Sequence, residues 1–224
     1  MLPLDVRSDD SATACLSAVA GLTDRLDILV NNAGFELAGA LEGISVDEGK
    51  AQFETNFFGI VRMVKAVLPL MRRQKHGQII NITSLAGLSP MPFMGVYSAS
   101  KFAVDGYTEA LRHEVKPFKI SVSQIAVGFL RTPMANHRRA VGGRIAEYDP
   151  WRQRALDAIR AFEEKAPGPE LVANTVLEIA VSKAPRLRYV VGQQAKLATR
   201  LRRFLPAGAY EQGVRRTFRL DREG

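Results

Sequence analysis

Residues 26–34 read LDILVNNAG and residues 78–84 read QIINITS, and in both an apolar run ends in small or polar residues. Residues 46–74, between them, carry apolar side chains at helical spacing. A short apolar run, a long helical segment and a second apolar run are typical of parallel strands joined by a helix. This stretch predicts an α/β protein built on a doubly wound parallel sheet.

The same alternation continues along the chain. We predict strands at residues 2–6, 26–31, 78–83, 120–127 and 188–191, and helices at residues 9–21, 46–74, 96–116 and 170–182. Ser8 before Asp9 suits a helix start, because its side-chain oxygen can accept from an unpaired backbone amide, and Pro169 with Glu170 suits another. Residues 133–168 form a long insertion with a short helix, and such insertions usually cover a binding site.

The composition is that of one globular domain over residues 1–224, with 46% hydrophobic and 24% charged residues. The lone Cys15 excludes an internal disulfide, and the first residues lack the pattern of a secretory signal peptide. No apolar run approaches the roughly 20 residues that span a bilayer. We therefore expect a cytoplasmic protein with at most peripheral membrane contact.

The formal net charge of +8 is concentrated at one end of the chain. From Lys183 onward, eleven Lys or Arg face three acidic residues, so the preceding part is neutral. A neutral body with a basic tail at residues 196–224 differs from a basic face, so we expect no nucleic-acid partner. In this tail Leu197, Leu201 and Phe204 lie among arginines. The segment either packs on its own domain or rests on an anionic membrane surface.

The residues best suited to chemistry are a tyrosine and a lysine four positions apart. Tyr97 and Lys101 share one face of a predicted helix. A free tyrosine has a pKa near 10 and is a poor base, whereas a nearby ammonium favours the phenolate. Ser84, at the end of a predicted strand, can point its hydroxyl at the same space. A tyrosine and a lysine four positions apart often occur by chance, so the accompanying motifs decide whether the pair indicates a catalytic site.

Two further features accompany this pair. Asn32, Ala33 and Gly34 form a turn after a predicted strand, at the sheet edge where ligands of parallel sheets bind. Asn56 lies inside a helical pattern, although asparagine has a low propensity for the interior of a helix. It is either a polar residue that bends the helix or the anchor of a water chain.

Taken in order along nearly the whole chain, these residues resemble the short-chain dehydrogenase/reductase family, which has a Rossmann-like fold. The matching set is Asp5-Val6, Asn32-Ala33-Gly34, Asn56, Ser84, Tyr97-x-x-x-Lys101 and Gly128-x-x-x-Thr132. The resemblance implies an oxidoreductase that interconverts an alcohol and its ketone or aldehyde with NAD or NADP.

The resemblance also implies a role for each matching residue. Tyr97 is the general acid/base, Lys101 lowers its pKa and holds the nicotinamide ribose, Ser84 polarises the substrate oxygen, and Asn56 supports a proton-relay water. The implied cofactor contacts, besides Tyr97 and Lys101, are Asp5 and Val6 for the adenine, Asn32, Ala33 and Gly34 for the adjacent ribose, and Gly128, Leu130 and Thr132 near the carboxamide. No metal site is expected.

The sequence is similar to the hydroxysteroid and retinol dehydrogenase branch, through Leu-Pro-Leu-Met at residues 68–71 and Pro-Phe-Met-Gly-Val-Tyr at residues 92–97. Apolar side chains near the site indicate an apolar or bulky alcohol or ketone, although core packing explains each of them equally well; they are Met91, Phe93, Met94, Phe129, Met134 and Trp151. The family builds dimers and tetramers from the helices predicted at residues 46–74 and 96–116, so we expect a homodimer or homotetramer.

The chain departs from the family pattern in two places. In the family a strand, a Gly-rich turn, a helix and a second strand precede the position of Asp5, whereas here Met1 stands four residues before it. We therefore expect that the first two βα units are missing, which leaves strand 26–31 at an edge and the chain poorly stable alone, or that the true start lies upstream. Val127 stands where the family usually has proline. The alternative to an enzyme is a cofactor-poor remnant that acts as a structural or regulatory partner subunit.

Overall fold

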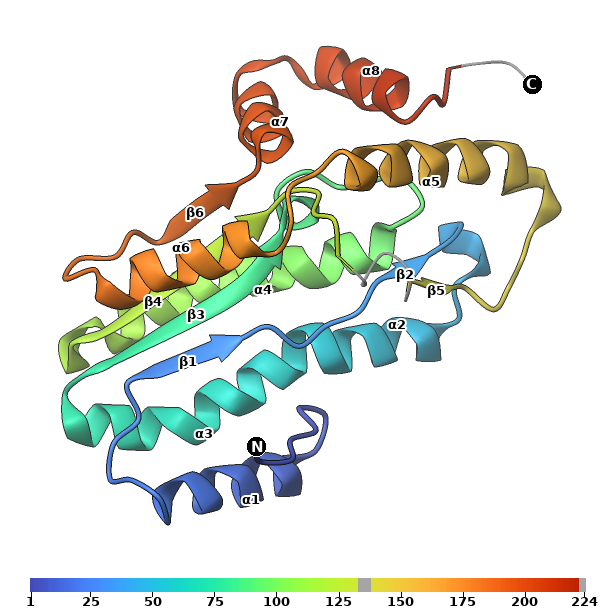
Figure 1. The fold of residues 1–224 in the computed structure, drawn as a ribbon. Coiled ribbons are helices and arrows are strands. Elements are labelled where there is room, and N and C mark those ends of the chain that lie inside the picture. Colours follow the sequence, from blue (N-terminus) through green and yellow to red (C-terminus); the bar gives the residue numbers. More distant parts are fainter. Residues whose placement is uncertain (133–137, 222–224) are drawn as a thin grey trace.

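A parallel sheet forms the centre of the molecule (Figure 1). The computed structural model describes residues 1–132 and 138–221. Within them the main sheet has four strands, all parallel, in the spatial order β1 (Ile28–Asn31), β3 (Gly77–Ser84), β4 (Ile120–Val127) and β6 (Arg188–Val191). A second, two-stranded sheet pairs β2 (Leu37–Ala38) with β5 (Arg139–Ala140). The predicted α/β class is confirmed.

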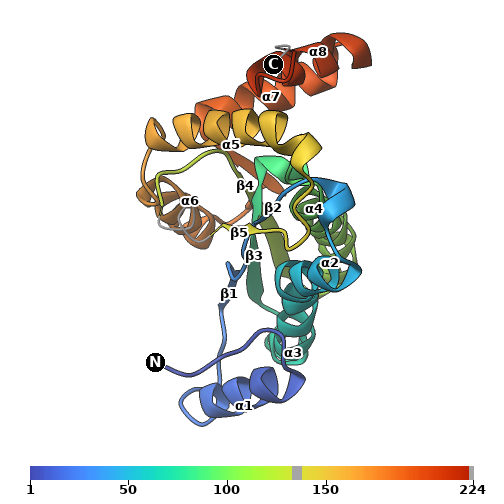
Figure 2. The ribbon, with the colours of Figure 1, turned by 90° about the vertical axis from the view of Figure 1, so that its right-hand side faces the viewer.

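Helices cover both faces of the main sheet (Figure 2). One face carries α2 (Val46–Phe53), α3 (Gly59–Gln74) and α4 (Gly95–Val115), and α1 (Asp9–Ala20) packs on α3. The other face carries α6 (Glu170–Val181). Beyond the carboxyl ends of the strands lie α5 (Asp149–Glu164), α7 (Gln193–Phe204) and α8 (Ala207–Thr217). In the described part of the chain, no helix is both long and apolar enough to cross a membrane.

The two central strands are apolar on both faces, as expected for a parallel sheet buried between helices. Ile79 and Ile80 in β3, and Val122 and Ile125 in β4, are fully buried. The predicted strands at residues 26–31, 78–83, 120–127 and 188–191 are confirmed within two residues. In the described part of the chain β1 pairs only with β3, so it lies at the edge of the sheet as predicted.

The helix starts follow from local capping. The Ser8 side chain accepts a hydrogen bond from the backbone N–H of Ser11 and begins α1. Ser45 and Glu48 form a reciprocal capping box at the start of α2. The predicted helices at residues 9–21, 96–116 and 170–182 are confirmed within one residue at each end.

The predicted strand at residues 2–6 is wrong, because this segment forms no strand. A strand needs a neighbour to satisfy its backbone, and this segment lies against α3 rather than beside the sheet. The Val6 carbonyl accepts from the Arg62 guanidinium at 2.5 Å. A Cβ on Gly59 would lie 2.9 Å from a Val6 methyl, so glycine is what lets the segment approach α3.

Two other elements differ from prediction, and a third agrees with one of its two alternatives. The helix predicted at residues 46–74 contains a π-helical turn at Glu54–Phe58, between α2 and α3. The insertion at residues 133–168 contains a helix of 16 residues, α5, rather than a short one. The basic tail lies in α7 and α8, and its Phe218 is buried in a core cluster, which agrees with the alternative that the segment packs on its own domain.

Candidate active site

A cavity of about 560 Å³ opens at the carboxyl ends of β1, β3 and β4. Most of the predicted site residues line it together, namely Asn32, Gly34, Ser84, Tyr97, Lys101, Gly128, Leu130 and Thr132. Asp5, Val6, Ala33 and Asn56 are not part of its wall. Segments far apart in sequence therefore converge at the sheet edge where parallel-sheet proteins bind ligands.

The positions of Ser84, Tyr97 and Lys101 follow from their elements. Ser84 is the last residue of β3, and its hydroxyl accepts from the Ala86 backbone N–H at 3.1 Å. Tyr97 and Lys101 lie one turn apart near the start of α4. A Cβ on Gly87 would lie 2.8 Å from the Lys101 carbonyl, so the loop after β3 approaches α4 closely only because that residue is glycine.

Lys101 is buried with its charge directed at the sheet. Its Nζ donates to the Ile82 carbonyl at 3.1 Å and lies 5.9 Å from the centroid of the Tyr97 ring. Only 6% of the residue is exposed, and this burial lowers its pKa to about 8, although the Glu36 carboxylate acts in the opposite direction. The ammonium is thus easier to deprotonate than an ordinary lysine.

Tyr97 has a raised pKa. Burial is the largest cause, the negative charge of Glu36 adds to it, and the hydrogen bond with Ser84 lowers the pKa without reversing the shift. The sequence predicts that Lys101 lowers this pKa, but burial outweighs every lowering influence in the free protein. Tyr97 is therefore protonated in the free protein, which is the form a proton donor needs, but it becomes an effective acid only when a positive charge close by stabilises the phenolate.

Asn56 lies in the π-helical turn and is fully buried. Its Oδ1 accepts from the Phe35 backbone N–H at 3.0 Å, and its Nδ2 donates to the Phe35 carbonyl at 3.0 Å and to Ser100 Oγ at 3.2 Å. A Cβ on Gly34 would lie 3.1 Å from Asn56 Oδ1. The side chain thus ties the loop after β1 to α4, and π-turns of this kind often occur at functional sites.

The cavity also contains a charged cluster that sequence reasoning missed. Arg138 donates from Nε to Glu36 at 2.7 Å and from Nη2 to Glu163 at 2.5 Å. The three side chains are 9%, 14% and 13% exposed, and all line the cavity. Glu163 Oε2 is buried without a hydrogen-bond partner among the described residues. No local spacing links these positions, so the sequence holds no signal for them.

The apolar side chains expected around the opening divide into two groups. Met91 and Phe129 line the cavity. Met94 is fully buried in the core, Phe93 packs against that core, and Trp151 is largely exposed on α5. Met134 lies outside the described residues.

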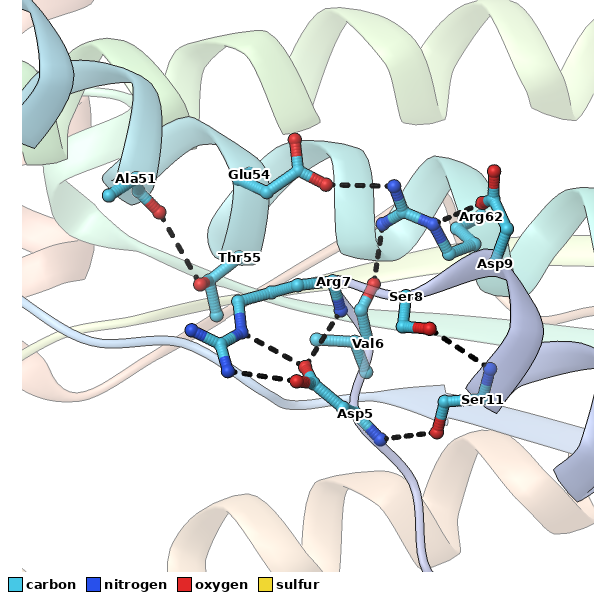
Figure 3. Close-up of polar contacts among 10 residues, drawn as sticks. All are labelled: Asp5, Val6, Arg7, Ser8, Asp9, Ser11, Ala51, Glu54, Thr55 and Arg62. Carbon is cyan, nitrogen blue, oxygen red and sulfur yellow. Dashed lines mark hydrogen bonds and ion pairs between the residues drawn. The ribbon is translucent and has the colours of Figure 1, made fainter.

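Asp5 and Val6 lie away from the cavity wall, beside α1 and α3 (Figure 3). The Arg7 guanidinium donates to both Asp5 carboxylate oxygens, at 3.0 and 2.8 Å, and this pairing lowers the pKa of Asp5 to about 2. The Asp5 backbone N–H donates to Ser11 Oγ at 2.9 Å. The structure therefore gives Asp5 a local partner, and its contact with adenine stays a prediction.

The wall is suited to the nicotinamide and ribose part of a dinucleotide. Lys101 supplies a buried cation beside Tyr97, and Gly34 and Gly128 are part of the same wall. Leu130 and Thr132 lie on the same wall, after β4. These are the residues that would hold the ring and its ribose.

Comparison with known proteins agrees with this arrangement. The family model "short chain dehydrogenase" matches residues 1–141. A 3-ketodihydrosphingosine reductase of Bacteroides thetaiotaomicron is 37% identical over 218 residues, which are 96% of this chain and 81% of that protein. Retinol dehydrogenase 8 of Homo sapiens is 40% identical over 194 residues, 83% of this chain and 61% of that protein.

Solved structures support the same conclusion. A short-chain dehydrogenase/reductase from Burkholderia phymatum in complex with NAD superimposes with a TM-score of 0.74 at 26% identity, covering 89% of this chain and 73% of that one. Similar solved structures hold NAD or NADP. A fold, a cavity and a sequence that all agree with these proteins make this chain an oxidoreductase of the short-chain dehydrogenase family.

Proposed function

We propose that the protein interconverts a secondary or primary alcohol and its ketone or aldehyde by hydride transfer, with Tyr97 as general acid/base. The observation that carries the proposal is the convergence of Ser84, Tyr97 and Lys101 in one cavity at the carboxyl ends of the strands. When bound, NAD or NADP supplies or accepts the hydride. The protein must then move one proton to or from the substrate oxygen.

Tyr97 is placed to move that proton. Its raised pKa keeps the hydroxyl protonated in the free protein, ready for donation to a carbonyl oxygen in the reductive direction. Ser84 lines the same cavity and would hold the same substrate oxygen. Lys101, in its charged form, would stabilise the phenolate left on Tyr97 and contact the nicotinamide ribose. Asn56 supports this group by fixing the Phe35 loop and α4.

The first experiment separates cofactor binding from chemistry. Titration with NADH and NADPH, followed by energy transfer from Trp151, tests binding, and oxidation of the bound cofactor by a panel of ketones tests turnover. Tyr97→Phe should reduce turnover by roughly two to four orders of magnitude and leave cofactor affinity nearly unchanged. Full turnover in this variant would overturn the assignment. No response to either cofactor would favour the partner-subunit alternative.

We also propose a homodimer or homotetramer, formed through α3 and α4. Val64, Val104 and Leu111 are buried against the sheet, so a contact between subunits would have to use other residues of these helices. Phe58 and Phe118 are exposed near these helices, and exposed aromatic residues favour interfaces. Light scattering of the purified protein tests this oligomeric state, and a monomer at micromolar concentration would contradict it.

We also propose a cytoplasmic location for the protein, which cell fractionation tests.

A further inference from the structure

A second cavity, of about 260 Å³, lies beneath α7 and α8. These helices follow the end of the sheet and lie beyond residues 1–141, the part that matches the family model. The Arg202 guanidinium fixes α7 to the body by donating to the Leu88 carbonyl at 2.6 Å and by lying 5.2 Å from the centroid of the Phe102 ring. The two helices thus form a roof over this cavity.

The second cavity adjoins the catalytic one. Leu85, Met91 and Phe129 line both. Phe129 also stacks on Phe162, with ring centroids 5.0 Å apart, and Phe162 lines only the second cavity. Three apolar side chains therefore lie between the space beside Tyr97 and the space under the roof.

The two cavities differ in chemistry. Lys101, Glu36, Arg138 and Glu163 place charges in the catalytic cavity. Among the described residues, the wall of the second cavity holds no charged side chain and is mostly aliphatic and aromatic. The wall contains the hydroxyl groups of Ser89 and Tyr210, and these are hydrogen-bonded to each other. A group that enters this space loses hydration without gaining a charge partner, so only an apolar group is stabilised there.

We propose that the second cavity is a subsite for the apolar chain of a long-chain alcohol or ketone, whose oxygen lies beside Tyr97. This rests on the proposed function and extends it by naming the substrate class. The chain leaves the catalytic cavity between Met91 and Phe129 and ends beneath α7 and α8. Affinity should then rise with chain length beyond what the catalytic cavity alone accommodates, by about fourfold for each buried methylene.

The test is equilibrium binding of unbranched alcohols from hexanol to tetradecanol, measured by displacement of a fluorescent probe. It needs neither cofactor nor turnover, so it fails or succeeds independently of hydride transfer. Gly213→Leu narrows the second cavity, since Gly213 lines it and a Cβ there meets nothing within 4 Å. Gly208→Leu is the matched control, because Gly208 lies on the same helix in equally open space and does not line the cavity.

We expect Gly213→Leu to weaken tetradecanol binding at least about tenfold and to leave hexanol binding unchanged, whereas Gly208→Leu should leave the binding of both alcohols unchanged. Neither variant should lower the melting temperature, because leucine favours the helix more than glycine does. Ala198→Phe, which narrows the same cavity from α7, should reproduce the effect even if Gly213→Leu points its side chain into solvent. Equal tetradecanol affinity in the wild type and both cavity variants would overturn the proposal. The proposal would also be overturned if the cavity variants changed only the oligomeric mass of the protein. That result would indicate that a second copy of the chain binds in the cavity.

Discussion

Two arginines, each bridging two carboxylates, stabilise opposite ends of this molecule in different surroundings. Arg138 bridges Glu36 and Glu163 inside the catalytic cavity, where all three side chains are largely buried. Arg62 bridges Asp9 and Glu54 at the N-terminal segment, where Asp9 is 87% exposed (Figure 3). The geometry of the pairs is similar, but solvent screens only the second cluster.

Burial, more than the geometry of the pair, therefore determines what an ion pair contributes to the stability of the fold. In the cavity, each charge has lost its water and depends on its partner, so the cluster is costly to break and shapes the charges around Tyr97. At the N-terminal segment, water replaces a lost partner at little cost. Variants at the two arginines should therefore behave differently.

Arg138→Ala should produce the largest loss of stability. It leaves Glu36 and Glu163 buried without their shared cation, and we expect the free energy of unfolding to fall by about 3–5 kcal/mol. Urea unfolding measures this. Arg138→Met combined with Glu36→Gln and Glu163→Gln removes all three charges and should recover most of the loss. A cost below about 1 kcal/mol for Arg138→Ala would show that solvent reaches this cluster.

The predicted site residues that the structure brings into one cavity are partly related by local spacing. Tyr97 and Lys101 are one helical turn apart and Ser84 ends a strand, and the family resemblance indicated that these two elements meet. The Arg138 cluster joins positions 36, 138 and 163, which only the complete fold brings together. No property of the single residues marks them beforehand.

The failures have similar physical causes. Residues 2–6 have a strand-like composition, but pairing depends on a neighbouring strand that composition cannot supply. The π-helical turn at Asn56 depends on hydrogen bonds to Phe35 and Ser100, which are 21 and 44 residues away. Helix α5 is longer than the predicted short helix, and Pro150 lies in its first turn, where proline is accepted.

The next largest effect concerns Lys101 and pH. Its pKa is lowered to about 8 in the folded protein and is about 10.4 in the unfolded chain. Between these values the unfolded chain binds more protons, so stability should rise with pH, by up to about 3 kcal/mol over the full window. Tyr97 does not oppose this below about pH 10, because its folded pKa is raised.

Urea unfolding between about pH 7 and 10 tests this prediction. The wild type should gain stability across this range, and Lys101→Met, which has no titrating group there, should lose that slope. An equal slope in both proteins would show that Lys101 remains hydrated in the folded state.

Arg62→Ala should have a smaller effect. It removes the pairs with Asp9 and Glu54 and the hydrogen bond to the Val6 carbonyl. Because one carboxylate is almost fully exposed, we expect a loss of about 1 kcal/mol that shrinks at high salt. Thermal unfolding at low and high ionic strength measures it, with Asp9→Asn as the control for the exposed pair. A loss as large as that of Arg138→Ala would mean that the N-terminal segment is held as firmly as the cavity.

Arg7→Ala should have the smallest effect on stability, although it changes a pKa strongly. Arg7 holds the pKa of Asp5 at about 2, so the variant should raise that pKa toward its ordinary value of about 4, measured by NMR titration of the carboxyl group. Both side chains are exposed and only two residues apart, so much of their attraction persists in the unfolded chain. Stability at neutral pH should therefore change no more than it does for an ordinary surface substitution. A larger loss of stability would show that the ion pair between Arg7 and Asp5 holds the N-terminal segment in its folded position.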